Sequence, residues 1–119
     1  MATMSQMTTA GGLLFISGQV AFDESGAVVG SSDPRTQVEQ VFRNLRNLLA
    51  EEAADFSHVV KLTAYVTDAL VYKDYAEVKA RIFRGITPPA ATTVIVRGLL
   101  HPDLLIEVEA VATRPRDHH

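Results

Sequence analysis

The sequence contains no cysteine. Disulfides, thiolate nucleophiles and zinc sites built on thiolates are therefore excluded, and we expect a protein of the reducing cytoplasm. An excess of positive charge is also missing, because 11 lysines and arginines face 14 aspartates and glutamates, for a net charge of -3. Nucleic-acid binding normally begins with a basic surface, so no nucleic acid is expected as a partner. No apolar run approaches the roughly 18 residues of a membrane-spanning helix, so no membrane is expected either.

What is present fits one small globular domain. The chain has 119 residues, of which 47% are hydrophobic and 21% are charged. This length is close to the commonest domain size and leaves no room for separate binding and catalytic modules. We therefore expect a single domain over residues 1–119 with loosely ordered ends at 1–10 and 114–119. The last two residues, His118 and His119, resemble a purification tag.

The first half of the chain predicts strands followed by a helix. Residues 13–16 form a short apolar run that stops before Gly18, which is typical of a strand. Residues 20–29 place two apolar stretches around turn-forming residues and predict a hairpin. Asp33 can cap a helix over 34–52. Its apolar residues recur at spacings of three and four and form one stripe: Val38, Val41, Phe42, Leu45, Leu48 and Leu49.

The second half predicts three strands and one further helix. Strict alternation marks strands at 58–67 and 104–112, and β-branched residues mark a third at 92–96. A helix is expected at 71–84, with Lys79 and Arg81 facing solvent. Its apolar face is expected to contain Tyr72, Tyr75, Val78 and Ile82.

These elements predict an α+β fold with two or three strands followed by the order αβαββ. Two helices can cover only one face of such a sheet, so the other face must meet water or another subunit. The side chains expected on that bare face mix polar and apolar types, as subunit contacts do. They are Lys61, Thr63, Tyr65, Leu105, Glu107, Glu109 and Val111.

Three segments together resemble the RidA/YjgF family, the reactive-intermediate deaminases, also called the endoribonuclease L-PSP family. Residues 12–19 read GLLFISGQ and resemble the family's entrance strand. Residues 59–68 read VVKLTAYVTD and resemble a second family strand. Residues 88–94 read PPAATTV, and 106–110 read IEVEA, which is similar to the family's two C-terminal motifs. Their order and spacing extend the resemblance from about residue 4 to residue 113.

The resemblance implies a chorismate-mutase-like ββαβαββ fold, with two helices on one face of a mixed sheet, and a homotrimer with a central barrel and clefts between subunits. It also implies a site for a small-molecule ligand and no cofactor. In active members, an arginine directly after the P-P-A tripeptide pairs with the carboxylate of a 2-imino acid. Here Ala91 holds that position, so this chain resembles a branch without the catalytic arginine. Met4 and Ala76 likewise hold the positions of a family tyrosine and a family asparagine.

The resemblance leaves three matching cleft residues, which are Gly18, Thr92 and Glu107. Glu107 corresponds to the family's cleft glutamate and is the expected catalytic residue; its alternative role is that of a polar side chain on a half-exposed strand. Glu109 lies on the same face and either repels Glu107 or pairs with Lys61 or an arginine of a neighbouring subunit. Arg97 is the candidate substitute for the missing arginine. No metal site is expected, because no histidine has a second ligand at suitable spacing.

Three functions follow from these residues. The first is hydrolase-like or deaminase-like chemistry on an imine, enamine or carbonyl compound other than a standard 2-imino acid, with Glu107 as acid or base. The second is a ligand-binding or interaction trimer that has lost its chemistry. The third is a 2-iminobutanoate or 2-iminopropanoate deaminase in which another cation replaces the arginine. RNA cleavage, which one family name suggests, is the least expected, given the acidic charge.

Overall fold

Five strands and two α-helices form the regular structure of residues 4–115, the part of the chain that the computed structural model describes. The elements follow one another in the order ββαβαββ that the family resemblance implies, and no third strand precedes the first helix within residues 4–115. They are β1 (Met7–Ala10), β2 (Leu13–Gln19), α1 (Pro34–Glu51), β3 (Val59–Val66), α2 (Ala69–Ile82), β4 (Ala90–Ile95) and β5 (Ile106–Thr113), with a short 3-10 turn at Phe56–His58.

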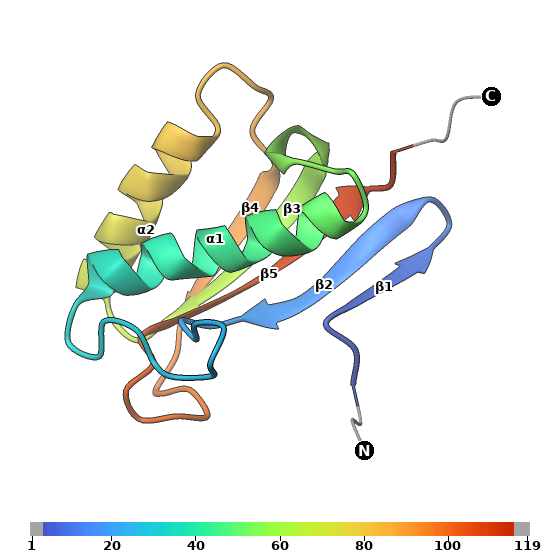
Figure 1. The fold of residues 1–119 in the computed structure, drawn as a ribbon. Coiled ribbons are helices and arrows are strands. Elements are labelled where there is room, and N and C mark those ends of the chain that lie inside the picture. The colour runs from blue at the N-terminus through green and yellow to red at the C-terminus, as the bar shows by residue number, and fades with distance from the viewer. Residues whose placement is uncertain (1–3, 116–119) are drawn as a thin grey trace.

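The strands form one mixed sheet, and both helices lie on the same face of it (Figure 1). The strand order is β1-β2-β5-β3-β4. Only the β3–β4 pair is parallel, because α2 carries the chain back between these two strands, and the other three pairs are antiparallel. The predicted fold class is therefore confirmed: two helices cover one face of a mixed sheet.

The core lies between the helices and the sheet. Helix α1 begins where Asp33 accepts a hydrogen bond from the backbone N–H of Thr36, and its apolar stripe is buried as predicted, apart from the half-buried Leu48. Along β5, Ile106, Val108 and Ala110 are buried under the helices. The alternate residues of β5 point to the opposite face, which no element among residues 4–115 covers.

Residues 7–10 were predicted to be loosely ordered, and this prediction was wrong. These residues form strand β1, which pairs with β2 through a turn at Gly11 and Gly12, both with positive φ. The sequence gives no alternation there because β1 is an edge strand whose residues are mostly exposed on both sides. Conversely, the hairpin predicted at 20–29 is reduced to a single bridge between Phe22 and Val28.

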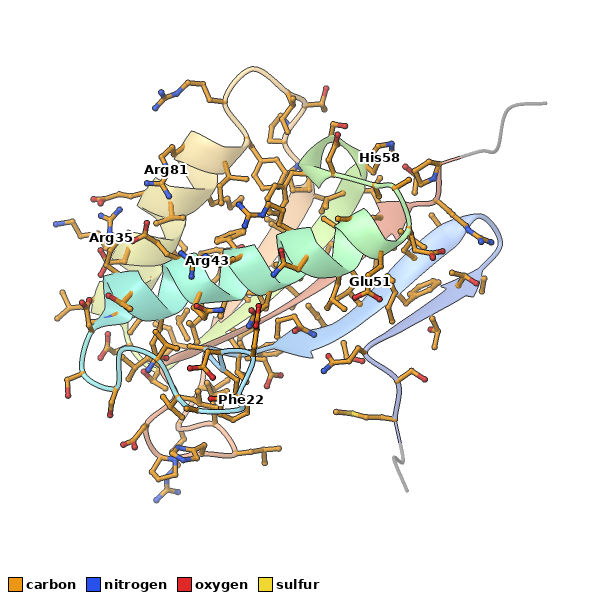
Figure 2. All side chains as sticks on the ribbon, viewed as in Figure 1. Phe22, Arg35, Arg43, Glu51, His58 and Arg81 are labelled. Carbon is orange, nitrogen blue, oxygen red and sulfur yellow. The ribbon has the colours of Figure 1, made fainter. Side chains whose placement is uncertain are left out.

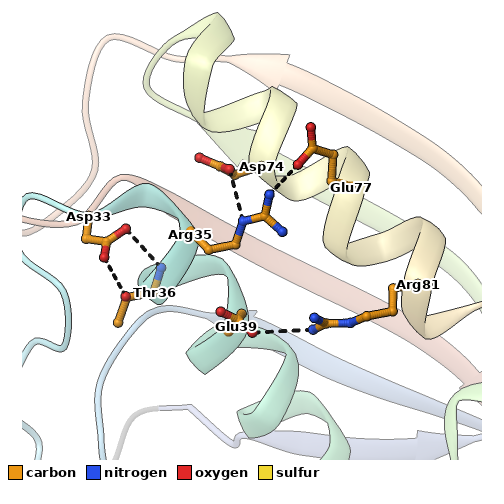
Figure 3. A network of polar contacts seen from close by, with 7 residues as sticks. All are labelled: Asp33, Arg35, Thr36, Glu39, Asp74, Glu77 and Arg81. Carbon is orange, nitrogen blue, oxygen red and sulfur yellow. Dashed lines mark hydrogen bonds and ion pairs between the residues drawn. The ribbon is translucent and has the colours of Figure 1, made fainter.

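Charged side chains tie α1 to α2 on the outer surface (Figures 2 and 3). The Arg35 guanidinium donates to Asp74 Oδ1 at 3.1 Å and also pairs with Glu77. One turn further along, Arg81 lies 3.4 Å from Glu39. These pairs place the carboxylates of α2 on its α1-facing side. Within residues 4–115, no helix is both long and apolar enough to cross a membrane.

Candidate functional site

Glu107 lies directly against the backbone of Gly18 on the uncovered face of the sheet. Strand β2 pairs with β5, and its register shifts between Ile16 and Gln19, so Gly18 sits in the irregular stretch beside β5. A Cβ atom built on Gly18 would lie only 2.5 Å from Glu107 Oε2. Gly18 does not have positive φ, so the glycine is required for space rather than for backbone conformation.

The surroundings of Glu107 favour its protonated form. Burial raises the pKa of the Glu107 carboxyl above its usual range, and the negative charge of Glu109 raises it further. Glu109 accepts a hydrogen bond of 2.6 Å from the Tyr65 hydroxyl, and this bond raises the pKa of Tyr65. A carboxyl group that exchanges a proton closer to neutral pH is suited to acid–base chemistry.

Of the alternatives predicted for Glu109, repulsion of Glu107 agrees with the raised pKa of Glu107, whereas pairing with Lys61 is wrong. Glu109 pairs with Tyr65, whereas Lys61 Nζ donates to Thr92 Oγ1 at 2.6 Å. Thr92 stands beside Thr63 in the parallel β3–β4 pair, so it shares the uncovered face with Lys61 and Tyr65. The uncovered face thus carries Glu107, Gly18 and Thr92, three of the six predicted site residues.

Two other predicted site residues line a groove of about 630 Å³ between α2 and β4. Ala76 contributes from the helix and Ala91 from the strand. The helix residues of the groove recur at spacings of three and four and form one face of α2, and the strand residues alternate along β4 on the side that faces the helices. The lining residues are Tyr72, Tyr75, Ala76, Lys79, Ala80, Phe83, Pro88, Ala91, Thr93 and Ile95.

Tyr75 forms part of the groove wall and belongs to the core, as predicted. It is 1% exposed and stacks on Phe42 with ring centroids 5.8 Å apart. Burial raises the pKa of Tyr75 to about 12, and its hydroxyl has no hydrogen-bond partner among residues 4–115. Tyr72, which was expected on the same apolar face of the helix, is 46% exposed and lines the groove.

The remaining predicted residues lie elsewhere. Met4 is 76% exposed and lines a second hollow, of about 490 Å³, that also includes Gly18 and Phe22. Arg97 is exposed in the loop after β4 and is not among the lining residues of the α2–β4 groove. Among residues 4–115, no group of three or more histidine, aspartate or glutamate side chains is arranged to hold a metal ion.

One subunit therefore divides the predicted site between two surfaces. Glu107 and Gly18 are on the uncovered face at β5 and β2, whereas Ala91 and Ala76 face the helix side at the β4 edge. Strand β3 lies between β5 and β4. Sequence reasoning also missed Lys79, which was expected to face solvent but lines the groove. Its position three residues after Ala76 was the available signal, because residues at that spacing share a helix face.

Comparison with known proteins decides the family. The profile of the endoribonuclease L-PSP family matches residues 1–114. The chain belongs to this family, that of the RidA and YjgF proteins. Protein DfrA of Myxococcus xanthus is 38% identical over 103 residues, which cover 87% of this chain and 77% of DfrA. A RutC family protein of Pyrococcus horikoshii is 35% identical over 108 residues, covering 91% of this chain and 84% of that protein.

Solved structures of RidA/YjgF proteins share the fold. The Rid family protein YyfA of Yersinia pestis, described as a protein of unknown function, has a TM-score of 0.89 at 28% identity, with coverage of 95% of this chain and 89% of YyfA. The family and fold that the three sequence motifs predicted are thus confirmed. The roles of individual residues in this RidA/YjgF chain remain predictions from the resemblance.

Proposed function

We propose that this RidA/YjgF protein hydrolyses or isomerises a small imine, enamine or carbonyl compound in a cleft shared by two copies of the chain. In imine hydrolysis, water adds to the C=N carbon, and the nitrogen leaves as ammonia while a carbonyl forms. Glu107 would take the proton from the water and deliver it to the nitrogen. The supporting observation is the partly buried Glu107 carboxyl against Gly18, with its raised pKa.

A second copy of the chain is needed to complete such a cleft. Glu107 and the α2–β4 groove lie on different faces of one subunit, so they can meet only if another copy brings its own groove to the uncovered face. That face carries exposed apolar side chains, including Phe15 and Val94, each 41% exposed. A homotrimer, which the family resemblance implies, would bury them.

The substrate is proposed to differ from the standard short 2-imino acids. Ala91 offers neither the charge nor the paired donors with which a guanidinium holds a carboxylate. Losing such a contact costs about 2–5 kcal/mol, which corresponds to roughly 30-fold to several-thousand-fold in affinity. A compound that needs the clamp at this position would therefore bind poorly.

Freshly generated imines test the proposal. Iminopropanoate, iminobutanoate and the imine of phenylalanine would be produced in place from amino acids, and loss of each imine would be followed with wild type and Glu107→Gln. We expect wild type to accelerate hydrolysis of the bulkier imine more than that of the two short ones, and Glu107→Gln to abolish the acceleration. Hydrolysis that Glu107→Gln leaves unchanged would contradict the role of Glu107.

The same variants test the alternative function, that of a ligand-binding protein without catalytic activity. If no imine is turned over, yet small molecules raise the melting temperature of wild type and Glu107→Gln equally, the chemical part of the proposal fails and the binding function replaces it. RNA that stays intact with repurified protein would exclude the ribonuclease activity that the family name suggests.

A further inference from the structure

Lys79 gives the α2–β4 groove a single positive charge. Among the groove's lining residues within 4–115, Lys79 is the one with a charged side chain. The other polar groups are the hydroxyls of two tyrosines and Thr93. Like an ordinary tyrosine, Tyr75 has a neutral hydroxyl at physiological pH, and burial raises its pKa further, to about 12. The groove therefore presents one cation among otherwise neutral and mostly apolar walls.

The charged network of α2 leaves Lys79 without an acidic partner. Asp74 and Glu77 are both engaged by Arg35 on the side of α2 that faces α1, as Figure 3 shows. Among residues 4–115, no carboxylate lies within ion-pair distance of the Lys79 amine. Lys79 is thus available to an anion from outside the subunit's own helices.

The Lys79 amine is also held at the groove rather than extended away from it. Its Nζ atom lies 5.8 Å from the centre of the Tyr75 ring, in reach of a cation–π contact. Tyr75 is itself fixed by burial and by stacking on Phe42. The two residues are four apart on α2, so the helix itself brings the amine over the ring.

We propose that Lys79 is the cation that holds the ligand of this groove, and that the ligand is a small monoanion, such as a carboxylate, with an apolar or aromatic body. The inference rests on the proposed function and names its substrate class. The charge comes from the α2 wall, across from Ala91 on β4. The walls beside it, Tyr72, Phe83 and Ile95, suit an apolar body. A groove of about 630 Å³ is in the range of pockets for ligands much larger than a four-carbon acid.

A binding experiment with a charged and a neutral probe tests this proposal. The dissociation constants of 3-phenylpropanoate and its uncharged amide, 3-phenylpropanamide, would be measured by calorimetry on the full chain. We expect Lys79→Met to weaken the anion roughly 10-fold or more and to leave the amide nearly unchanged. Lys79→Arg, which keeps the charge, should retain most of the affinity. Lys73→Met is the matched control, since Lys73 is an exposed lysine of the same helix outside the groove.

Three results would overturn the proposal. The first is no binding of 3-phenylpropanoate to wild type at millimolar concentration. The second is an equal loss of affinity for the anion and the amide in Lys79→Met, and the third is a loss of affinity for the anion in Lys73→Met as large as that in Lys79→Met. Melting temperatures of the variants check that each is folded. The assay needs no turnover, and Glu107→Gln should bind the anion. If Lys79→Met loses its affinity for the anion while wild type hydrolyses no imine, the role of Lys79 in ligand binding stands and the proposed chemistry fails.

Discussion

At the scale of single residues, the protonation state of Glu107 depends on its neighbours. Its pKa is raised in the folded protein by burial and then by Glu109. The folded state therefore binds this proton more tightly than the unfolded chain does. The stability that the group contributes is fully present below its unfolded pKa and is lost as the pH rises through the raised pKa. Once it is ionised, the Glu107 carboxylate is less favourable in the folded protein than in the unfolded chain, so its charge slightly destabilises the fold.

The direction of this pKa shift predicts how Glu107→Gln changes the stability of the protein with pH. Glutamine removes the charge while keeping the shape, so the variant should melt higher than wild type at pH 7–8. The difference should shrink as the pH falls below the unfolded pKa of Glu107, where the carboxyl becomes protonated in both states. Thermal unfolding across this range measures it. A variant that is less stable than wild type at pH 8 but not at pH 4 would show that the sign is reversed.

Gly18 tests whether the position of Glu107 matters separately from its charge. In Gly18→Ala, the new methyl group would occupy the place of the Glu107 carboxylate, whose flexible end can move aside. We expect a stability loss below about 1 kcal/mol. Because catalytic groups tolerate little displacement, imine turnover should fall by about 100-fold. Gly98→Ala is the control, because a Cβ there meets nothing within 4 Å. Equal activity of the two variants would contradict the role of Gly18.

For single site residues, the sequence predicted some positions correctly and others not. Glu107 and Gly18 were singled out because both match family motifs, and they do lie together. Lys79 was assigned to solvent because a charged residue beside an apolar helix face is usually exposed. Its spacing from Ala76 indicates the helix face that it shares, but the groove itself depends on how β4 lies beside α2, which no local pattern encodes.

At the scale of elements, the buried Gln37 joins α1 to the loop before β5. Its side-chain amide donates to the carbonyls of Gly30 and Asp103, at 3.1 and 2.7 Å, and accepts from the N–H of Leu105 at 2.8 Å. Among residues 4–115, the Asp103 carbonyl and the Leu105 N–H have no other partner, whereas the Gly30 carbonyl also accepts from the Asp33 N–H. One side chain thus satisfies two backbone groups that would otherwise be unpaired.

Gln37→Leu should therefore destabilise the protein although it adds an apolar residue to the core. It leaves the Leu105 N–H and the Asp103 carbonyl without a partner, while the Gly30 carbonyl keeps the Asp33 N–H, for an expected loss of about 1–3 kcal/mol in the free energy of unfolding. Gln40→Leu is the matched control, since within residues 4–115 the Gln40 side chain hydrogen-bonds to the Asn44 and Arg43 side chains and to no backbone group. Chemical denaturation compares the two. A loss for Gln37→Leu no larger than that for Gln40→Leu would contradict this account.

The elements that were predicted correctly are those with one buried face. Helix α1 and strands β3 and β5 show clear periods because burial selects apolar residues on one side only. β1 was missed because an edge strand with little burial leaves no such pattern. Helix α2 begins at Ala69, two residues before the predicted start, because the Asp68 side chain accepts from the N–H groups of Leu70 and Val71. That capping signal was present in the sequence but was not used.

At the scale of the whole molecule, the uncovered sheet face predicts self-association. In Val111→Glu a charge enters the middle of that face, beside Glu109. We expect wild type to sediment at about three times the chain mass of 13.0 kDa and the variant to shift toward the monomer. Ala50→Glu is a control on the exposed outer side of α1. A wild type that stays monomeric at micromolar concentration would contradict the shared cleft.

The most direct test of the account asks whether one site is built from two copies. Glu107→Gln removes the proposed acid–base group, and Ala91→Trp fills the groove. Each pure variant should hydrolyse the phenylalanine imine far more slowly than wild type. After the two are unfolded, mixed in equal amounts and refolded together, activity should return to about a quarter of the wild-type rate, the share of interfaces at which an intact Glu107 meets an intact groove. A mixture no more active than the pure variants would place the whole site within one chain and contradict the account.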